Sequence, residues 1–151
     1  LIARKMEITD NVIVSSNSEM AKNLFLLGMY FENDLYTEQS IQMVKNVRDD
    51  VKKNLQYYSN WAQALIAQVH SFYEIAIVGK NWKEKLARFQ KNYTPDLLYA
   101  GGEGPNMNLP LLSGKLIENK TTIYVCKDKT CNRPVQEITE ALEQIKTGSS
   151  T

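Results

Sequence analysis

The sequence is poor in the residues from which metal sites and reaction centres are usually built. Its 151 residues include one histidine, two cysteines and seven glycines. A structural zinc site takes about four ligands, so His70, Cys126 and Cys131 together fall short of one. We therefore expect no metal and no other cofactor. Two cysteines are also too few for a disulfide-stapled secreted scaffold, which favours a cytoplasmic setting.

An excess of one charge and a long apolar run are missing as well. The chain has 18 basic and 17 acidic residues, so its net charge of +1 gives no general attraction to nucleic acid or to a membrane surface. The longest apolar candidate, residues 24–31, is far shorter than the roughly 20 residues of a membrane span. The chain starts at Leu1, with neither an initiating methionine nor a signal-peptide pattern. We interpret it as an excised segment of a longer protein.

Apolar residues recur at helical spacing in three successive stretches. The residues 16–19, Ser-Asn-Ser-Glu, are typical of a capping box in which Ser16 caps the first helix. That helix is apolar on more than one side, which predicts burial on several faces. We expect Thr37 to cap a second, amphipathic helix and Ser59 to begin a third. Because the connections are short, the three helices should pack as antiparallel neighbours.

The pattern changes from helical to mixed at Phe72. Short apolar runs predict three strands, at 73–78, 97–100 and 121–126. Helices are expected from Trp82 and from Pro134, which suits the first position of a helix.

Helix crossovers between these strands favour a small, three-stranded, mostly parallel sheet. The predicted fold is thus an antiparallel helical segment at 1–71, a small α/β module at 72–147 and a flexible tail at 148–151.

The polar loop from Asp10 to Ser18 is the most unusual stretch and the first candidate site. Asp10 has the chemistry of a general acid or base, or of an acceptor for carbohydrate hydroxyls. Asn17 is a second catalytic candidate, and Ser15, Asn17 and Ser18 are candidates for hydrogen-bonding a ligand. The alternative is a loop that caps the following helix and satisfies its own backbone.

Cys126 and Cys131 form the second candidate site. Their C-x4-C spacing differs from the C-x-x-C of a dithiol redox motif. The two thiols are expected to lie across a tight turn, close enough to form a disulfide, with a redox-labile pair or a metal site as alternatives. Gly79 follows a strand, but without further glycines it indicates a plain turn rather than a phosphate loop.

Several blocks of the chain resemble one family. The stretch from Asp10 to Ala21, DNVIVSSNSEMA, is similar to a D-x-A-x-P-S-x-N-S-x-x-A-type segment of large thioredoxin-domain proteins related to spermatogenesis-associated thioredoxin-like proteins. Residues 73–79, 109–115 and 124–134 resemble later blocks of that family, in the same order. One departure is Val14, where the family often has proline, so the loop should be less rigid here.

The resemblance implies a parent protein with a thioredoxin-like domain and an (α/α)6 barrel similar to six-hairpin glycosidases. Residues 1–71 would then be closing helices of that barrel. We expect the chain by itself to be a non-catalytic packing module rather than an enzyme, with the remainder of the parent chain as its partner. We expect neither nucleic acid nor membrane as a partner, and only weak self-association through exposed helical faces. Two alternatives remain: a loop contributed to a carbohydrate site through Asp10, and a thiol redox role of Cys126 and Cys131.

Overall fold

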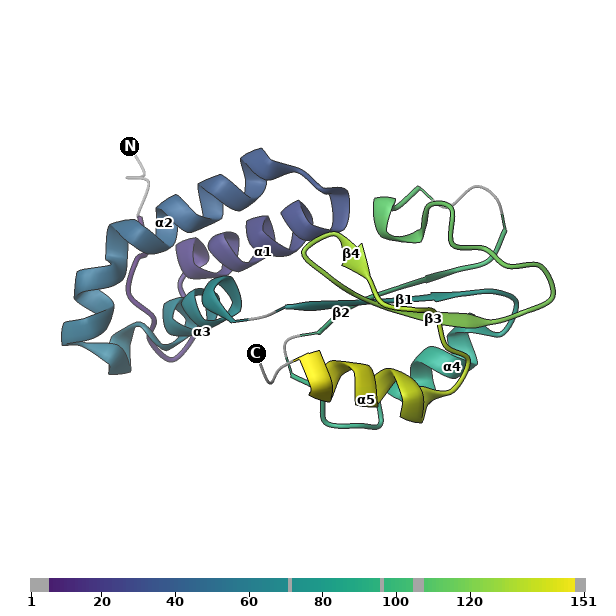
Figure 1. Ribbon diagram of the computed structural model, residues 1–151. Helices are drawn as coiled ribbons and strands as arrows, with labels where there is room; N and C mark the ends of the chain where they lie inside the picture. The colour runs from purple at the N-terminus through teal and green to yellow at the C-terminus, as the bar shows by residue number, and fades with distance from the viewer. Residues whose placement is uncertain (1–5, 71, 96, 105–107, 149–151) are drawn as a thin grey trace. The chain divides into compact units, whose positions relative to one another are not determined.

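The structure is a computed structural model that describes residues 6–70, 72–95, 97–104 and 108–148. The chain divides between His70 and Ser71 into two compact units. The predicted fold class is confirmed, because a helical part is followed by a mixed α/β part (Figure 1). The tail predicted at 148–151 lies outside the described residues except for Gly148, the last residue of the final helix.

The first unit is helical throughout its described secondary structure. Its core is formed by valines of the second helix, Val44, Val47 and Val51, against Trp61 of the third. Short connections bring all three α-helices into mutual contact. Its described helices are α1 (Ser16–Phe31), α2 (Asp34–Lys53), the 3₁₀ helix η1 (Leu55–Tyr57) and α3 (Ser59–Val69).

The starts of α1 and α2 differ from the predicted ones. Ser15, not Ser16, caps α1, and its side chain accepts a hydrogen bond from the Ser18 amide. Asn33, not Thr37, caps α2. In both cases a polar residue just upstream reaches the first free amides of the helix, which leaves the predicted residue inside the first turn.

Helix α1 is buried on one face rather than on several. Ala21, Phe25 and Gly28 lie in the interior, whereas Met20, Leu27 and Phe31 remain exposed. The close approach of α2 explains the glycine, because a Cβ atom at Gly28 would lie 2.7 Å from the Thr37 methyl carbon. The prediction of burial on several faces was therefore wrong for this unit by itself.

The second unit is a small sheet with two α-helices on one face and a 3₁₀ helix on the other. Helices α4 and α5 cover that face, and the 3₁₀ helix η2 lies on the other (Figure 1). Apolar side chains of β1 and β3 form the helix-side core with Phe89 of α4 and Ala141 of α5. The described elements are β1 (Tyr73–Val78), α4 (Trp82–Phe89), β2 (Leu97–Gly102), η2 (Pro110–Leu112), β3 (Thr122–Lys127), β4 (Thr130–Cys131) and α5 (Ile138–Gly148).

The sheet differs in detail from the three-stranded, mostly parallel one that was predicted. Within the described residues it has four strands in the order β2-β1-β3-β4, and among their pairings β1 with β2 alone is parallel. The α4 crossover makes that pair parallel. The next connection stays at one end of the sheet, since Val78 pairs with both Gly102 and Thr122. Strand β3 therefore starts where β1 and β2 end and must run antiparallel to them.

The last helix starts later than the predicted position, Pro134. The backbone of Val135 pairs with that of Ile123 through two hydrogen bonds, of 2.7 and 3.0 Å. This pairing keeps the chain extended beside β3, so α5 begins only at Ile138.

Candidate functional site

The Asp10 carboxylate is the centre of a buried hydrogen-bond network in the helical unit. Its side chain is only 4% exposed. One oxygen, Oδ1, accepts from the Ser15 amide at 2.9 Å and from the Ser18 hydroxyl at 2.8 Å. The other, Oδ2, accepts a hydrogen bond from the backbone amide of Asn60 at 2.8 Å. A single carboxylate thus joins the loop, the start of α1 and the start of α3.

Asn60 extends this network into α1. Its Nδ2 donates to the Ser18 hydroxyl at 2.9 Å and to the Glu19 carboxylate at 3.2 Å. Its Oδ1 accepts from the Lys22 ammonium group at 2.9 Å. Each side-chain end of Asn60 is therefore bonded to α1, although the two segments are about 40 residues apart in sequence.

The network holds Asp10 in its ionised form. Burial by itself raises the pKa of this carboxyl, but the hydrogen bonds from Ser15, Ser18 and Asn60 outweigh it, so the pKa lies below the ordinary value of 3.8. A general acid or base that works near neutral pH needs the opposite shift. The geometry thus suits a charged structural acceptor.

The other residues predicted for this site also bond within the chain. The Asn17 side chain donates to the Glu7 carbonyl at 2.7 Å, and the Ser15 hydroxyl caps α1. The Asp10 amide donates to the Tyr57 carbonyl, and the indole of Trp61 donates to the Ile8 carbonyl, both at 2.7 Å. The structure brings Asp10, Ser15 and Ser18 together, while Asn17 ties the loop from its outer side.

Asn60 is the residue of this network that the sequence did not reveal. It comes 50 positions after Asp10, and nothing local links the two. The available signal was a polar residue at the start of the apolar α3, beside the buried Trp61.

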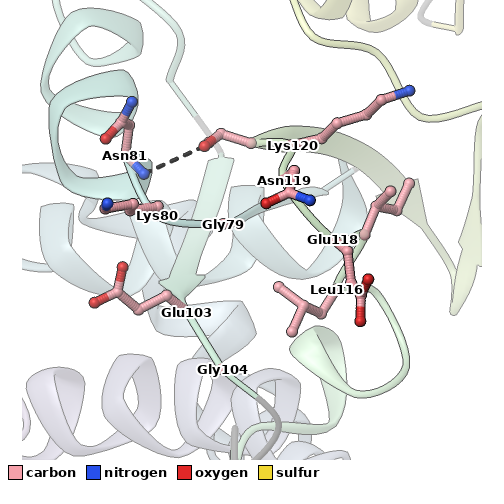
Figure 2. Close-up of a pocket in the computed structure, with 11 residues that line it drawn as sticks. Gly79, Lys80, Asn81, Glu103, Gly104, Leu116, Glu118, Asn119 and Lys120 are labelled. Atoms are coloured by element: carbon pink, nitrogen blue, oxygen red, sulfur yellow. Dashed lines mark hydrogen bonds between the residues drawn. The ribbon is translucent and has the colours of Figure 1, made fainter.

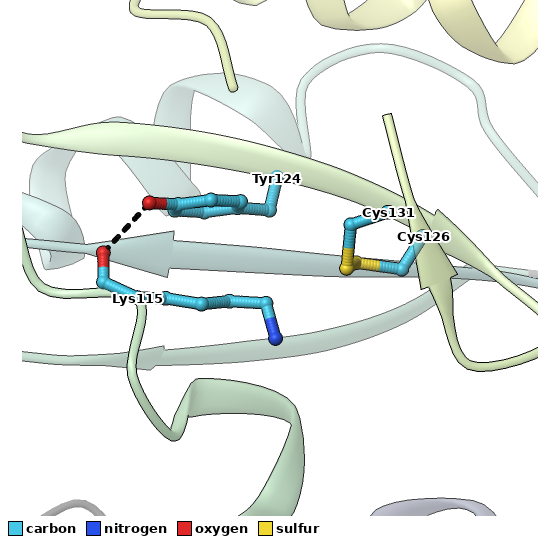
Figure 3. The surroundings of a disulfide bond; sticks show 4 residues. All are labelled: Lys115, Tyr124, Cys126 and Cys131. Carbon is cyan, nitrogen blue, oxygen red and sulfur yellow. Dashed lines mark hydrogen bonds between the residues drawn. A yellow bond between two sulfur atoms is a disulfide. The ribbon is translucent and has the colours of Figure 1, made fainter. Parts of the chain in front are cut away.

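The two cysteines are joined by a disulfide in the α/β unit (Figure 3). They face each other in the β3–β4 ladder, where Cys126 is buried and Cys131 is half-buried. On the same face of β3, the Tyr124 hydroxyl donates to the Lys115 carbonyl at 2.9 Å, and the Lys115 ammonium group lies 5.8 Å from the centre of the Tyr124 ring. Burial raises the pKa of the Tyr124 hydroxyl.

A pocket of about 560 Å³ opens at the carboxyl ends of β1 and β2, where open α/β sheets commonly bind ligands. In Figure 2, Lys80 and Glu103 stand on one side of it, and Glu118 and Asn119 on the other. These charged and amide side chains are exposed and carry both signs of charge. The pocket therefore shows no preference for one class of ligand.

Across residues 6–70, 72–95, 97–104 and 108–148, no three side chains of His, Cys, Asp or Glu are grouped to hold a metal ion. His70 is the C-cap residue that follows α3, and its backbone amide donates to the Ile66 carbonyl. None of the described helices combines the length and the apolar character that crossing a bilayer requires.

Comparison with protein-family models, with curated proteins and with solved structures found no match for the chain.

Proposed function

We propose that this chain is a non-catalytic region of a larger, cytoplasmic, thioredoxin-linked protein, in which its helical unit supplies closing helices of an α/α barrel and packs against the other helices of that barrel in the remainder of the protein. The family resemblance of four sequence blocks supports the identity of the partner. The loop from Asp10 to Ser18 then has a structural role, because it ties α1 to α3.

An exposed apolar row on α1 is the observation that carries the packing role. It consists of the exposed Met20, Leu27 and Phe31 together with the half-buried Leu24, and we call it the α1 stripe. The residues follow one another at intervals of four, three and four, so they lie on one face of the helix. Met20 is 52% exposed, Leu27 41% and Phe31 53%. A continuous apolar row of this kind is typical of a surface that is covered in the complete protein.

The alternative, a carbohydrate site at the Asp10 loop, has weaker support. Sugar recognition needs carboxylate and amide groups that point towards a ligand. Both oxygens of Asp10 instead accept hydrogen bonds from buried donors of the chain. We therefore favour the packing role.

Glutamate at Leu27 and Phe31 tests the α1 stripe. Without its partner, the native chain should bind an apolar fluorescent dye and self-associate weakly as concentration rises. The double variant Leu27→Glu/Phe31→Glu should weaken self-association about tenfold or more, because charges must then enter an apolar contact. Sedimentation velocity over a concentration series, with dye fluorescence in parallel, measures both effects.

The matched control is Leu55→Glu/Val69→Glu, which changes two apolar residues of the same unit that are 57% and 70% exposed but lie outside α1. This control should self-associate and bind dye as the native chain does. A native chain that stays monomeric throughout, with dye binding equal in all three proteins, would refute a docking role for the stripe.

A further inference from the structure

We propose that Cys126 and Cys131 form a reversible dithiol–disulfide site, at which a dithiol reductant attacks the sulfur of Cys131 first. This is an activity of the α/β unit and goes beyond the packing role proposed for the helical unit. Four features support it: the short loop that the bond closes, the short strand β4 with its strained turn, the unequal burial of the two cysteines, and a cation on the same face of the sheet.

The disulfide closes an unusually short loop. The two cysteines are separated by five positions, and they already face each other across the β3–β4 ladder. A disulfide stabilises a fold mainly by restricting the unfolded chain, and it does so least for short loops. This disulfide should therefore contribute little to the stability of the fold.

The hairpin depends on the bond more than the rest of the sheet does. Strand β4 has two residues, and the turn residues Asp128 and Lys129 have φ angles of 50° and 63°. Such a turn usually has glycine or asparagine at these positions, since lysine adopts the left-handed conformation at a cost. Breaking the disulfide should thus release β4 and leave β1, β2 and β3 in place.

The two cysteines differ in solvent exposure. Cys126 is 1% exposed in β3, whereas Cys131 is half-buried in β4, an edge strand of the described sheet. An incoming thiolate therefore reaches Cys131 more easily. Attack at Cys131 makes Cys126 the leaving group, and the separation of five positions keeps the two thiols within reach of each other, so the bond can re-form.

A cation lies on the same face as Cys126. The side chain of Lys115 runs along the Tyr124 ring in the direction of the disulfide (Figure 3). Tyr124 and Cys126 are two positions apart on β3, so their side chains point to the same face. The positive charge of Lys115 favours the approach of an anionic thiolate.

The exchange takes two steps and balances. The thiolate of the reductant attacks the sulfur of Cys131, a mixed disulfide forms, and the electron pair of the broken bond leaves on Cys126, which takes up the proton that the attacking thiol had lost. The second thiol of the reductant then loses its proton, attacks its partner sulfur in the mixed disulfide and releases Cys131, which takes up that proton. The reductant ends as a disulfide, and the chain gains two electrons and two protons.

The cytoplasmic setting proposed above adds a separate argument, which rests on that proposal. Disulfides are rare in that compartment, and those that form there are usually transient and redox-active.

Reduction of the native chain by dithiothreitol, without denaturant, tests the proposal. Thiol trapping with mass spectrometry should show both thiols appearing while the helical circular dichroism signal is retained, and oxidised glutathione should restore the bond. The rate should rise in proportion to the dithiothreitol concentration. A rate that levels off at the unfolding rate, or reduction only in denaturant, would overturn the proposal, because the bond would then be a buried staple.

Two single variants test the order of attack. In Cys126→Ser, the thiol of Cys131 should react with an aromatic disulfide reagent about 100-fold faster than the thiol of Cys126 does in Cys131→Ser. Lys115→Gln should slow reduction of the native pair severalfold, whereas the matched Lys91→Gln should not. Equal thiol rates, or a Lys115 variant that behaves like its control, would contradict the assignment. None of these results depends on the α1 stripe, which is tested separately.

Discussion

Replacing Asp10 by alanine should lower the free energy of unfolding of the helical unit by about 3 kcal/mol. The carboxylate is buried and accepts hydrogen bonds from the amides of Ser15 and Asn60 and from the Ser18 hydroxyl. Its removal leaves the two backbone amides without this acceptor in a site that solvent barely reaches, whereas the Ser18 hydroxyl keeps the Ser15 carbonyl as an acceptor. The loss exceeds that of an ordinary surface substitution, because buried donors cannot turn to water.

The two tryptophans allow each unit to be followed separately. Trp61 lies in the helical unit and Trp82 in the α/β unit. In a Trp82→Phe background, urea unfolding monitored by the fluorescence of Trp61 reports the helical unit. The matched control is Asp49→Ala, whose carboxylate is exposed on α2 and should change stability by less than about 0.5 kcal/mol. Equal effects of the two substitutions would show that the Asp10 network contributes nothing to the fold.

The effect of Asp10→Ala should also depend on pH. Because the pKa of Asp10 is lowered on folding, its contribution is fully present above the unfolded pKa, near 4, and is lost as pH falls through the folded value. The difference between native and variant unfolding energies should therefore be constant from neutral pH to about pH 5 and shrink in stronger acid. A difference that grows on acidification would contradict the lowered pKa.

Replacing Gly79 by alanine should destabilise the α/β unit by about 4 kcal/mol. Gly79 has a φ of 132°, which residues with a side chain rarely adopt. A Cβ atom there would also lie 2.3 Å from the Lys120 carbonyl oxygen and 2.7 Å from the Thr121 Cα. Both obstacles are backbone atoms, so the clash can be relieved only by moving the loop away from the end of β1.

Gly104→Ala is the matched control for Gly79→Ala. Gly104 also has a positive φ, of 95°, but among the described residues other than its chain neighbours no heavy atom lies within 4 Å of the position a Cβ would take. It should therefore show the conformational cost alone, roughly 1 kcal/mol. Unfolding followed by Trp82 fluorescence in a Trp61→Phe background measures both variants. A Gly79 variant no less stable than the Gly104 variant would show that the close backbone contact does not exist.

Local sequence signals predicted most elements but not their arrangement. The apolar run at 73–78 became β1, all of whose residues are buried, and Ser59 begins α3 as expected. The prediction of a mostly parallel sheet was wrong because the direction of β3 depends on the end of β1 to which the chain returns. Residues 103–121 contain no periodic pattern that determines this. The predicted helix start at Pro134 was wrong for a similar reason. Val135 pairs with Ile123, and this contact between separate segments keeps the chain extended there.

The candidate sites show the same division. The short spacing of Cys126 and Cys131 allowed a disulfide, and the bond is present. The polar character of the Asp10 loop was visible as well, whereas its purpose depends on Asn60, which only the packing of α3 brings near. A local stretch of sequence does not show whether its polar groups are free to bind a ligand when their hydrogen-bond partner comes from a distant part of the chain.

The most direct measurement for the Asp10 loop is the titration of the Asp10 carboxyl carbon by NMR in the native chain. If the loop is a closed structural tie, the midpoint should fall below 3.8, and the amide signals of Ser15 and Asn60 should shift at the same midpoint, because both amides donate to this carboxylate. A midpoint well above 3.8, with those amides unaffected, would contradict the structural role and would instead indicate a carboxyl group available for acid–base chemistry.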